Sequence, residues 1–546
     1  MTERLCTFDK ISNRRYLLFL CANNAGESAL VKSVGSFLRG DFMSNIRISN
    51  LSFRYDDSSE NIFNNLNLNL DSTWKLGLVG RNGRGKTTFL NLLRGKLHGL
   101  GDIQTRLNFS YYPIKIADPA NITLYELQKQ ANFEEWELDR ELNLMNVNPD
   151  LLWQPFNTLS GGEQTKVLLA LSFTNKDSFA LIDEPTNHLD EDSRQEISNY
   201  LGKHEKGYIV VSHDRDFLNQ VTDHILAIEN TEIHLYQGNF ATYEDTKQKR
   251  DEFNRERNQK LKGEINELHQ QKEQFYHWAQ KVEARKNIGR KYQHVLNRRT
   301  RLNKGAIGHA AAKMMKKSIN ARDRMDHKIQ AKQGLMTNIE DIPELSMNFK
   351  ANYHSTLLEI QHLDLQIDGK SLFKGLNLVV KNHGVVSLEG RNGSGKSTFL
   401  KMLLDKAPTV KYQGKYELAD GLSISYLPQN FTEYHGTLHK FAYEHKISYE
   451  ELLNNLKKMG FPRASFVTPI EEMSMGQQKR VALAKSLVEP ADLYLWDEPA
   501  NYLDVFNQDQ LIELLKKIKP AMLLIEHDEY FIEQVADQRV RLDIAE

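Results

Sequence analysis

Cysteine is almost absent from this chain of 546 residues, and the two that occur, Cys6 and Cys21, both lie near the N-terminus. The rest of the sequence therefore has no disulfide framework and no cysteine-based zinc site, a composition typical of a reducing cytosol. Long apolar runs are missing as well, because the longest candidate, residues 16–22, falls far short of the roughly 18 residues that span a bilayer. We therefore expect a cytoplasmic protein without a membrane span.

Residues 1–42 lack clear hydrophobic periodicity, and we expect an N-terminal extension there, either native or the product of a misassigned start. A secretory signal is the alternative, because Arg14 and Arg15 precede the apolar run at 16–22. That run is short and Glu27 follows it closely, which disfavours a signal peptide. The first strand is expected soon after Met43.

Acidic residues are missing from one long stretch. The 39 residues between Glu283 and Asp323 hold 12 Lys/Arg and no acid, and Thr246 to Lys332 holds 24 Lys/Arg against 9 Asp/Glu. The stretch from Thr246 to Lys332 therefore has a net charge of +15, and since the net charge of the whole chain is −1, the rest of the chain has a net charge of −16. Exposed helices usually mix both signs, so a run of one sign predicts contact with a polyanion, nucleic acid above all. A solvated helix face is the alternative.

Short apolar runs alternate with helical stretches over 44–240, and the same plan returns over 353–546. This pattern predicts two α/β domains with mainly parallel sheets. Buried strands are expected at 76–79, 179–182 and 208–211, and again at 385–388, 493–496 and 522–525.

The segment between these domains has a helical pattern instead. A narrow apolar seam predicts one long helix over 243–286, of roughly 60 Å, and a second over 310–339. The seam residues are Leu261, Ile265, Leu268, Phe275 and Val282, then Met325, Ile329, Met336 and Ile339. Gly289, Gly305 and Gly308 predict a basic loop between the helices. The expected domains are 1–42, the extension; 43–242, the first α/β domain; 243–345, a basic helical hairpin linker; and 346–546, the second α/β domain.

The pattern G-x-x-x-x-G-K-[ST] occurs twice, at 80–87 and 390–397. Backbone N–H groups of such a loop cradle phosphates, its lysine meets the β/γ-phosphates, and its hydroxyl holds magnesium. A chance match can explain one copy but not two, so the sequence predicts ATP and Mg²⁺ as cofactors. The candidate nucleotide contacts are Gly80, Asn82, Gly83, Gly85, Lys86, Thr87 and Thr88, and Gly390, Asn392, Gly393, Gly395, Lys396, Ser397 and Thr398; Thr87 and Ser397 are also candidate metal ligands.

An acidic pair follows an apolar strand in each domain, at 183–184 and 497–498. Aspartate at a strand end can reach magnesium, and the next glutamate can orient or deprotonate the attacking water. Solvated loop acids are the alternative, which the shared tails PTNHLD and PANYLD disfavour. A histidine stands 29 residues after each glutamate, and we interpret it as a γ-phosphate sensor. The candidate catalytic residues are Glu184, Glu498, His213 and His527, and the candidate metal ligands are Asp183 and Asp497.

Two further segments, LSGGEQ at 159–164 and MSMGQQ at 473–478, place a serine 23 residues before each strand-end aspartate. Small residues at a helix start present N–H groups to an anion. The candidate nucleotide contacts here are Ser160, Gly161, Gly162, Ser474 and Gly476.

Together these motifs resemble ATP-binding cassettes, a family in which the signature segment of one cassette closes over ATP held by the other. Two cassettes with a charged helical linker and no membrane domain resemble the ABC-F class over residues 44–546. The resemblance implies two tandem P-loop NTPase cassettes joined by a long antiparallel helical hairpin, paired within one monomer and hydrolysing ATP. The first cassette has no room for the arm insertion of many housekeeping members, and no long C-terminal extension follows the last expected strand.

Three strings narrow the resemblance to the Lsa group of antibiotic-resistance ABC-F proteins: WKLG at 74–77, GAIGHAAAKMMKKS at 305–318 and WDEP at 496–499. That group implies ribosome protection, with the bacterial ribosome, its large-subunit rRNA and the P-site tRNA as partners. The linker is then expected to enter the tRNA exit region toward the peptidyl-transferase centre and displace a lincosamide, streptogramin A or pleuromutilin. The candidate RNA contacts are Arg285, Lys286, Arg290, Lys291, Arg298, Arg299, Arg301 and Lys304.

The chain departs from the family pattern at several positions. Gln429 matches the glutamine that the family places near nucleotide and metal, but Ile114 replaces it in the first cassette. Tyr55 is the expected adenine-stacking aromatic, whereas the aligned second position is Ile367. The second signature also departs from the pattern, with MSMGQQ in place of LSGGEQ. If the cassettes pair head to tail, Ile114 and this second signature share one site. We predict that this site (Lys86, Glu184, Ser474, Gly476) hydrolyses ATP more slowly than the other (Lys396, Glu498, Ser160, Gly162).

Three alternatives remain. A housekeeping ABC-F translation factor that relieves stalled ribosomes has the same architecture. The ATPase component of an efflux transporter is disfavoured by the polycationic hairpin, so no membrane subunits are expected. A cassette-type DNA-repair ATPase is disfavoured by the missing zinc cysteines and the short coil, so no DNA partner is expected.

Overall fold

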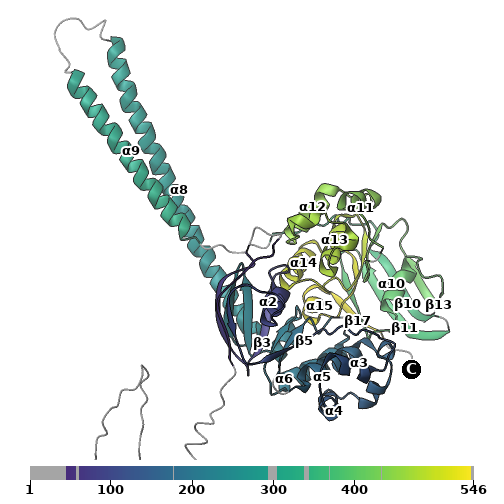
Figure 1. Cartoon of the computed structure of the whole chain (residues 1–546). Helices are drawn as coiled ribbons and strands as arrows, with labels where there is room; N and C mark the ends of the chain where they lie inside the picture. The colour runs from purple at the N-terminus through teal and green to yellow at the C-terminus, as the bar shows by residue number, and fades with distance from the viewer. Residues whose placement is uncertain are drawn as a thin grey trace, which may run out of the picture.

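The structure is a computed structural model that describes residues 45–56, 61–175, 178–187, 189–292, 304–336, 343–367, 369–431 and 433–542. In the linker, the side chains of residues 279–280, 282–292, 304–312 and 314–315 lie outside this description. The expected extension at 1–42 also lies outside the described residues. Two α/β domains face each other, and a pair of long helices projects from the first of them (Figure 1).

The first cassette contains two sheets. A three-stranded antiparallel sheet has the order β2-β1-β4 and contains β1 (Asn45–Phe53), β2 (Phe63–Asp71) and β4 (Leu100–Gln104). A six-stranded sheet has the order β5-β6-β7-β3-β8-β9. Its strands are β3 (Lys75–Gly80), β5 (Asn108–Tyr112), β6 (Ser178–Asp183), β7 (Tyr208–Val211), β8 (His224–Glu229) and β9 (Glu232–Gln237). Only the β8–β9 pair within it is antiparallel.

The second cassette repeats this plan. Its antiparallel sheet has the order β11-β10-β13, with β10 (Thr356–Ile367), β11 (Lys370–Lys381) and β13 (Val410–Leu418). Its parallel sheet has the order β14-β15-β16-β12-β17. These strands are β12 (Val385–Glu389), β14 (Ile424–Leu427), β15 (Leu493–Asp497), β16 (Met522–Ile525) and β17 (Gln538–Arg541). The α/β fold predicted for both domains is confirmed, and all six expected strand runs lie in the two main sheets.

Helices and short 3-10 turns complete each cassette. In the first they are α2 (Lys86–Leu93), α3 (Thr123–Gln130), α4 (Glu135–Leu144), η1 (Pro149–Trp153), η2 (Phe156–Thr158), α5 (Gly161–Thr174), α6 (Glu191–Lys203) and α7 (Arg215–Val221). In the second they are α10 (Lys396–Leu403), α11 (Leu438–Glu444), α12 (Tyr449–Lys458), η3 (Arg463–Phe466), η4 (Ile470–Glu472), α13 (Met475–Val488), α14 (Val505–Ile518) and α15 (Glu529–Val535).

Both faces of each main sheet are buried. In β6, Phe179 and Leu181 pack on the side of β1, β2 and α2, whereas Ala180 and Ile182 pack on the side of α5. Because successive strand residues point to opposite faces, a strand with helices or a sheet on both sides needs an uninterrupted apolar run. Polar residues therefore begin where these strands end, and the candidate catalytic acids follow there.

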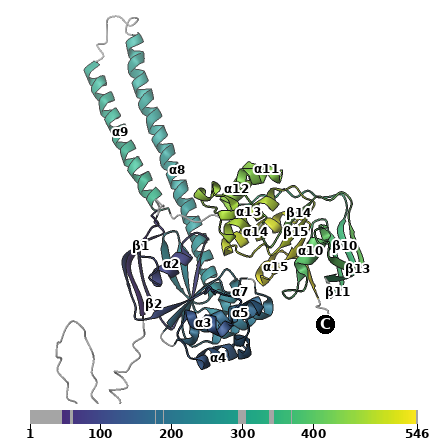
Figure 2. The ribbon, with the colours of Figure 1, turned by 45° about the vertical axis from the view of Figure 1, so that its right-hand side comes forward.

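The linker consists of α8 (Phe240–Tyr292) and α9 (Lys304–Gly334), which lie side by side and project away from both cassettes (Figures 1 and 2). Lys272 of α8 pairs with Asp326 of α9 at 2.5 Å, and Lys332 pairs with Glu264. Among the described residues, no helix is both long and apolar enough to cross a membrane.

The two linker helices differ from the expected ones. Gly289 lies within α8, and Gly305 and Gly308 lie within α9, so their assignment to a loop was wrong. One glycine in a helix costs only about 1 kcal/mol relative to alanine, and the alanines at 306 and 310–312 favour the helix. Leu261, at 9% exposure, belongs to the buried seam as expected, but Phe275 is 41% exposed. A straight helix drifts about 20° per heptad, so a residue two heptads along leaves the seam.

Candidate nucleotide sites

Each phosphate loop depends on a glycine that begins its helix. Gly85 precedes α2 with φ 97°, and Gly395 precedes α10 with φ 92°, a left-handed conformation that favours glycine. A Cβ on Gly85 would also lie 2.5 Å from Ile62, and one on Gly395 would lie 2.9 Å from Leu372. These turns bring successive backbone N–H groups to the start of a helix, where an anion binds.

The two loop lysines are buried inside their own loops. Lys86 donates through Nζ to the carbonyl oxygen of Gly80 at 2.8 Å, and Lys396 donates to that of Gly390 at 2.6 Å. Burial lowers the pKa of both lysines, and the carboxylates of Glu184 and Glu498 respectively oppose the shift. Each ammonium group therefore lies near a carboxylate that favours its charged form, and that positive charge can attract a phosphate.

The strand-end aspartates lie beside the loop hydroxyl positions. Thr87 donates through Oγ1 to Oδ2 of Asp183 at 2.9 Å, and the Tyr111 hydroxyl donates to the same oxygen at 3.1 Å. Asp497 is 1% exposed, and burial raises its pKa to about 6 while the Ser397 side chain beside it opposes the shift. Both of its carboxylate oxygens are buried. A divalent cation would satisfy these oxygens, and one carboxylate plus one hydroxyl per site is the protein contribution usual for Mg²⁺ with phosphates.

Glu184 and Glu498 share an unusual backbone. Their φ angles are 55° and 50°, and their N–H groups donate to the carbonyl oxygens of Val211 and Ile525 at 2.9 and 2.8 Å. A left-handed conformation costs energy for a residue with a side chain and is concentrated at functional sites. The turn holds each glutamate against the neighbouring strand, which carries the histidine loop.

The surroundings of the two glutamates differ. His213 Nε2 lies 3.2 Å from Oε1 of Glu184, whereas His527 Nε2 lies 4.0 Å from Oε1 of Glu498. Gln429 donates through Nε2 to Oε1 of Glu498 at 2.7 Å, a contact that Ile114, half-buried against the core, cannot make in the first cassette. Burial raises the pKa of Glu184 to about 8 and lowers that of His527 to about 4. Because Ile114 replaces the glutamine in the first cassette, Glu184 lacks the hydrogen bond that Glu498 accepts from Gln429.

The two signature segments begin helices in the same way. Ser160 accepts a hydrogen bond from the N–H of Glu163 at 3.3 Å, and Ser474 accepts one from Gln477 at 3.4 Å. In return, Oε2 of Glu163 accepts from the N–H of Ser160 at 2.7 Å and Oε1 of Gln477 accepts from that of Ser474 at 3.0 Å, so both helices have a capping box. Gln477 in the second signature therefore keeps the helix cap that Glu163 makes in the first, but it carries no negative charge.

The glycines of the signatures are not equally constrained. A Cβ on Gly161 would meet nothing within 4 Å, so Met475 at the matching position causes no clash. A Cβ on Gly162 would lie 2.5 Å from the Ser193 hydroxyl, which would have to rotate away, so glycine is favoured at this position. Gly476 keeps it in the second cassette.

The cassettes lie head to tail, with the first phosphate loop against the second cassette. The N–H of Asn82 donates to Oδ2 of Asp504 at 2.6 Å, and its amide donates to the carbonyl oxygen of Tyr502 at 3.2 Å. A Cβ on Gly476 would lie 3.4 Å from the same carbonyl oxygen and 4.0 Å from the Asn82 amide. The first phosphate loop and the second signature thus lie in one composite site, together with Glu184.

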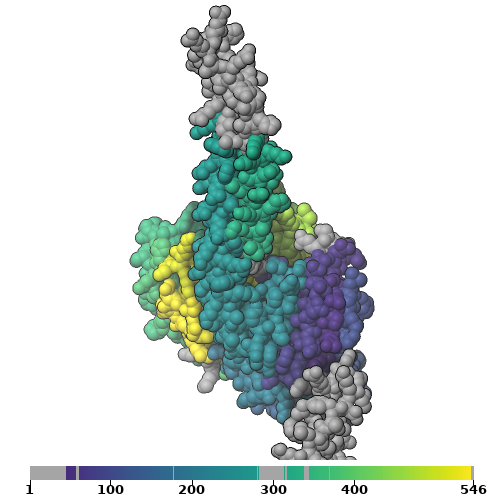
Figure 3. All heavy atoms as spheres, turned by 90° about the vertical axis from the view of Figure 1, so that its left-hand side faces the viewer, coloured from purple at the N-terminus to yellow at the C-terminus, as the bar shows by residue number. Residues whose placement is uncertain are grey.

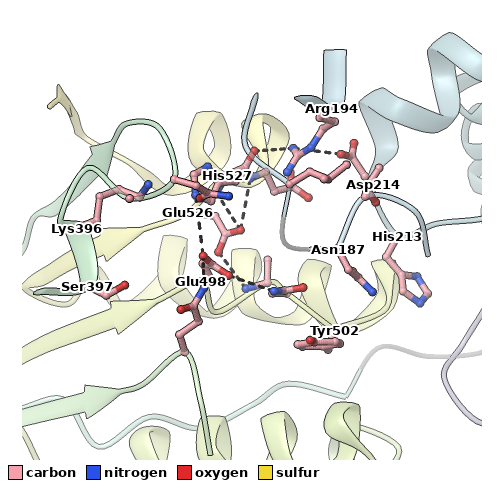
Figure 4. A pocket seen from close by; sticks show the side chains of 18 of the residues that line it. Asn187, Arg194, His213, Asp214, Lys396, Ser397, Glu498, Tyr502, Glu526 and His527 are labelled. Atoms are coloured by element: carbon pink, nitrogen blue, oxygen red, sulfur yellow. Dashed lines mark hydrogen bonds and ion pairs between the residues drawn. The ribbon is translucent and has the colours of Figure 1, made fainter. Parts of the chain in front are cut away.

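The second phosphate loop faces the first cassette in return. Arg391 pairs with Asp192 at 2.8 Å, and Arg194 donates to the carbonyl oxygen of His527 at 2.7 Å. A cavity of about 370 Å³ lies here, and both cassettes line it (Figure 4). Its lining includes Glu184, His213, Asn392, Gly393, Gly395, Lys396, Ser397, Thr398, Gln429, Glu498 and His527.

Ser160 and Gly161 lie outside this cavity. The cavity therefore gathers the loop, acid and histidine of the second site together with Glu184 and His213 of the first cassette.

Tyr55 lies over the first phosphate loop from the end of β1. Its hydroxyl lies 3.0 Å from Oγ1 of Thr88, and its ring is 43% exposed. An exposed ring at this position can stack on a base. Ile367, the aligned residue, packs against the core of the second cassette instead.

Arg215 joins three parts of the chain and was not identified from the sequence. It is 4% exposed, pairs with Glu244 of α8 at 2.6 Å and with Asp509 of α14, and lies 4.3 Å from the ring centre of Tyr530. It also begins α7, two residues after His213. No sequence signal reveals this role, because a charged residue in the first turn of a helix is ordinary.

The candidate RNA contacts belong to the outer linker. Arg298, Arg299 and Arg301 lie outside the described residues. The remaining five, Arg285, Lys286, Arg290, Lys291 and Lys304, lie on α8 or α9, but their side chains are outside the described part.

Known proteins match both cassettes. A family model described as ABC transporter matches residues 63–187 and 373–501. The ribosome protection protein VmlR of Bacillus subtilis (strain 168) is 27% identical over 511 residues, which cover 91% of this chain and 86% of that protein. ATP-binding protein Uup of Haemophilus influenzae is 26% identical over 516 residues, which cover 84% and 73%.

Among solved structures, the archaeal ribosome recycling factor aABCE1 in complex with ribosomal stalk protein aP1 matches with a TM-score of 0.58. The two sequences are 19% identical, and the match covers 91% of this chain and 88% of that chain, so it shows the shared fold. The paired phosphate loops, strand-end acids and family match define an ATP-binding cassette ATPase that hydrolyses ATP to ADP and phosphate. With two cassettes and relatives that match most of its length, the chain is similar to proteins of the ABC-F class.

Proposed function

We propose that this protein is a cytoplasmic ribosome-binding ABC-F ATPase that protects the large ribosomal subunit from antibiotics. The observation that carries the proposal is a cationic hairpin that projects from a pair of ATP-binding cassettes. Figure 3 shows α8 and α9 rising above both cassettes. A long lever with charge of one sign suits a deep polyanionic partner better than it suits a membrane subunit.

The exposed side chains of α9 support a nucleic-acid partner. Six basic residues in its described part are solvent-exposed: Lys313, Lys316, Lys317, Arg322, Arg324 and Lys328. On α8, Tyr276 and Trp278 are 49% and 47% exposed. Cations that contact phosphates beside aromatic rings that stack on bases are the usual surface for RNA binding.

The nucleotide sites would drive this lever. The phosphate loops, through Lys86 and Lys396, hold the phosphates in each composite site. Thr87 with Asp183, and Ser397 with Asp497 and Gln429, would hold Mg²⁺, which supplies positive charge to the phosphates. Glu184 and Glu498 orient and deprotonate the attacking water. Binding of ATP closes the cassettes and positions the hairpin, and hydrolysis releases it.

We further propose that the hairpin enters the tRNA exit region beside the P-site tRNA and reaches toward the peptidyl-transferase centre. There it displaces drugs of the lincosamide, streptogramin A or pleuromutilin type. The resemblance to the Lsa group supports this target, as does the similarity to a protein named for ribosome protection. Pairing of the cassettes within one chain supports a monomer.

Ribosome pelleting tests the proposal. The Glu184→Gln/Glu498→Gln protein with ATP should co-sediment with ribosomes, and binding should weaken steeply as salt rises, because counterions are released from RNA phosphates. Neutralising Arg298, Arg299, Arg301 and Lys304 to glutamine should reduce binding roughly tenfold or more.

A matched variant neutralises four exposed cassette lysines, Lys370, Lys374, Lys381 and Lys401, and should bind normally. Equal loss in both variants, or binding that ignores ATP, would contradict the proposal. Expression in a drug-sensitive strain then separates protection from a housekeeping role, since only the former raises resistance.

A further inference from the structure

The histidine loop of the second cassette contains a buried acid that the first cassette lacks. Glu526 precedes His527, whereas Ser212 precedes His213 at the matching position. The Glu526 side chain is 4% exposed and lines the same cavity as Lys396 and Glu498 (Figure 4). A buried carboxylate next to another acid is costly and needs a specific reason.

The carboxylate of Glu526 bridges two loops of the site. Oε2 accepts a hydrogen bond from the N–H of Ala500 at 3.2 Å, two residues after Glu498. Oε1 accepts from the N–H of His527 at 3.2 Å and from that of Asp528 at 3.4 Å. One side chain therefore fixes the segment after Glu498 relative to the loop that carries His527.

The first cassette makes the same bridge with neutral groups. The Ser212 hydroxyl lies 3.0 Å from that of Thr186, which matches Ala500, and it accepts from the N–H of Asp214 at 3.1 Å. Both hydroxyl groups are buried. The bridge is thus present in both cassettes, but only the second builds it with a group that can carry a charge. Burial raises the pKa of Glu526 to about 8, and the N–H groups of Ala500 and His527 oppose the shift.

A buried lysine accompanies that charge. Lys479 of α13 is 1% exposed, and its Nζ lies 5.2 Å from the ring centre of Phe431. Burial lowers the pKa of Lys479, and the negative charges of Glu526, Glu498 and Asp497 oppose the shift. The first cassette has Thr165 at the matching position. Three positions therefore differ together: Lys479, Ala500 and Glu526 against Thr165, Thr186 and Ser212.

We propose that Glu526 is a positioning residue for ATP hydrolysis at the site of Glu498, and that it acts together with Lys479 and Ala500, the two other positions that differ from the first cassette. Its hydrogen bonds from the backbone N–H groups of Ala500, His527 and Asp528 hold Glu498 and His527 in one geometry. Small displacements of catalytic groups reduce turnover strongly while leaving substrate binding almost intact. This inference rests on the proposed role of Glu498 as the base.

Steady-state ATPase kinetics of the full chain test the inference, in a Glu184→Gln background where turnover reports the Glu498 site. Glu526→Ser should lower kcat about tenfold and leave the KM for ATP within about twofold. The triple variant Lys479→Thr/Ala500→Thr/Glu526→Ser rebuilds the first-cassette set and should recover kcat to within about threefold of the background. Glu533→Ser replaces an exposed acid on α15, the helix that follows the His527 loop, and should change neither constant.

An unchanged kcat in Glu526→Ser would overturn the inference. So would a triple variant whose kcat is no higher than that of Glu526→Ser, provided that both proteins melt at the temperature of the background protein. If Glu526→Ser does not fold, the neutral pair Lys479→Thr/Glu526→Ser is measured instead and should still be slower than the triple variant; equal rates would count against the bridge. Glu498→Gln added to the background separates the two ideas. If the Glu184→Gln/Glu498→Gln protein still hydrolyses ATP, Glu498 is not the catalytic base, and the proposed function fails rather than the inference about Glu526.

Discussion

Asn82 and Asp504 are joined across the cassette interface, with the backbone N–H of Asn82 lying 2.6 Å from Oδ2 of Asp504. Asp504 is 3% exposed, and its Oδ1 accepts from the N–H of Asn507 at 2.8 Å, which caps α14. One carboxylate therefore connects the first phosphate loop to the segment that follows Glu498. An acid here lies where the loop is built to receive a phosphate.

Removing this charge should alter nucleotide binding. Asp504→Asn keeps an oxygen to cap α14 but removes a negative charge beside the phosphates, so ATP should bind the first loop about fivefold more tightly. Equilibrium binding in a Lys396→Ala background checks it. Asp190→Asn in a Lys86→Ala background is the counterpart at the second loop, because Asp190 likewise caps its own helix, through the N–H of Ser193. Weaker binding in Asp504→Asn would refute the electrostatic reading.

The two sites should turn over at different rates. Gln429 contacts Glu498 directly, and Ile114 leaves Glu184 without that contact. Glu498→Gln should therefore remove most of the ATPase activity, about tenfold or more, and Glu184→Gln less than about threefold. Steady-state phosphate release compares the single variants at equal protein concentration. Equal losses would show that the sites are equivalent.

Arg215 should couple the cassettes to the linker. Arg215→Met leaves Glu244 and Asp509 without their partner, and we expect a loss of about 3 kcal/mol of stability together with weaker ATP-dependent ribosome association. Arg250→Met is the control, because Arg250 joins the same linker helix, α8, to Glu229 of the first cassette and not to α14. Thermal melting and ribosome pelleting in the doubly Glu→Gln background measure both effects. If Arg250→Met weakens association as much, the connection to α14 is not the cause.

Glu141 should make the first cassette sensitive to acid. Burial alone raises the pKa of Glu141, but hydrogen bonds from His204, Tyr200 and Arg140 outweigh it and hold the pKa at about 2. A lowered pKa stabilises the fold above the ordinary value of 4.5, and this contribution disappears as pH falls toward 2. Glu141→Gln should cost about 2 to 3 kcal/mol at pH 7.

Chemical unfolding as a function of pH checks this dependence. The difference between wild type and Glu141→Gln should narrow as pH falls from about 4.5 to about 2. Glu135→Gln, an exposed acid on the same helix, should show no difference at any pH. A gap that stays constant with pH would mean that packing, not charge, stabilises this position.

The strands and phosphate loops follow from the sequence, because local rules specify them. An apolar run such as 208–211 must be buried on two faces, and glycines such as Gly85 allow a turn that other residues resist. The candidate acids at 183–184 and 497–498 were identifiable for the same reason, since they stand where those runs end. The linker helices were also visible, but their ends were not, because Gly305 and Gly308 carry a weak local signal that flanking alanines override.

The composite sites were decided by tertiary structure. Nothing adjacent in sequence relates Asn82 to Asp504 or Arg215 to Asp509, because these contacts arise only when two folded cassettes meet. The different surroundings of Glu184 and Glu498 likewise depend on side chains from separate strands and helices. The sequence by itself determined which chemical groups each cassette carries, through patterns that act over a few residues. Packing between distant segments decided which of those groups share a site, because burial and hydrogen bonding act through space.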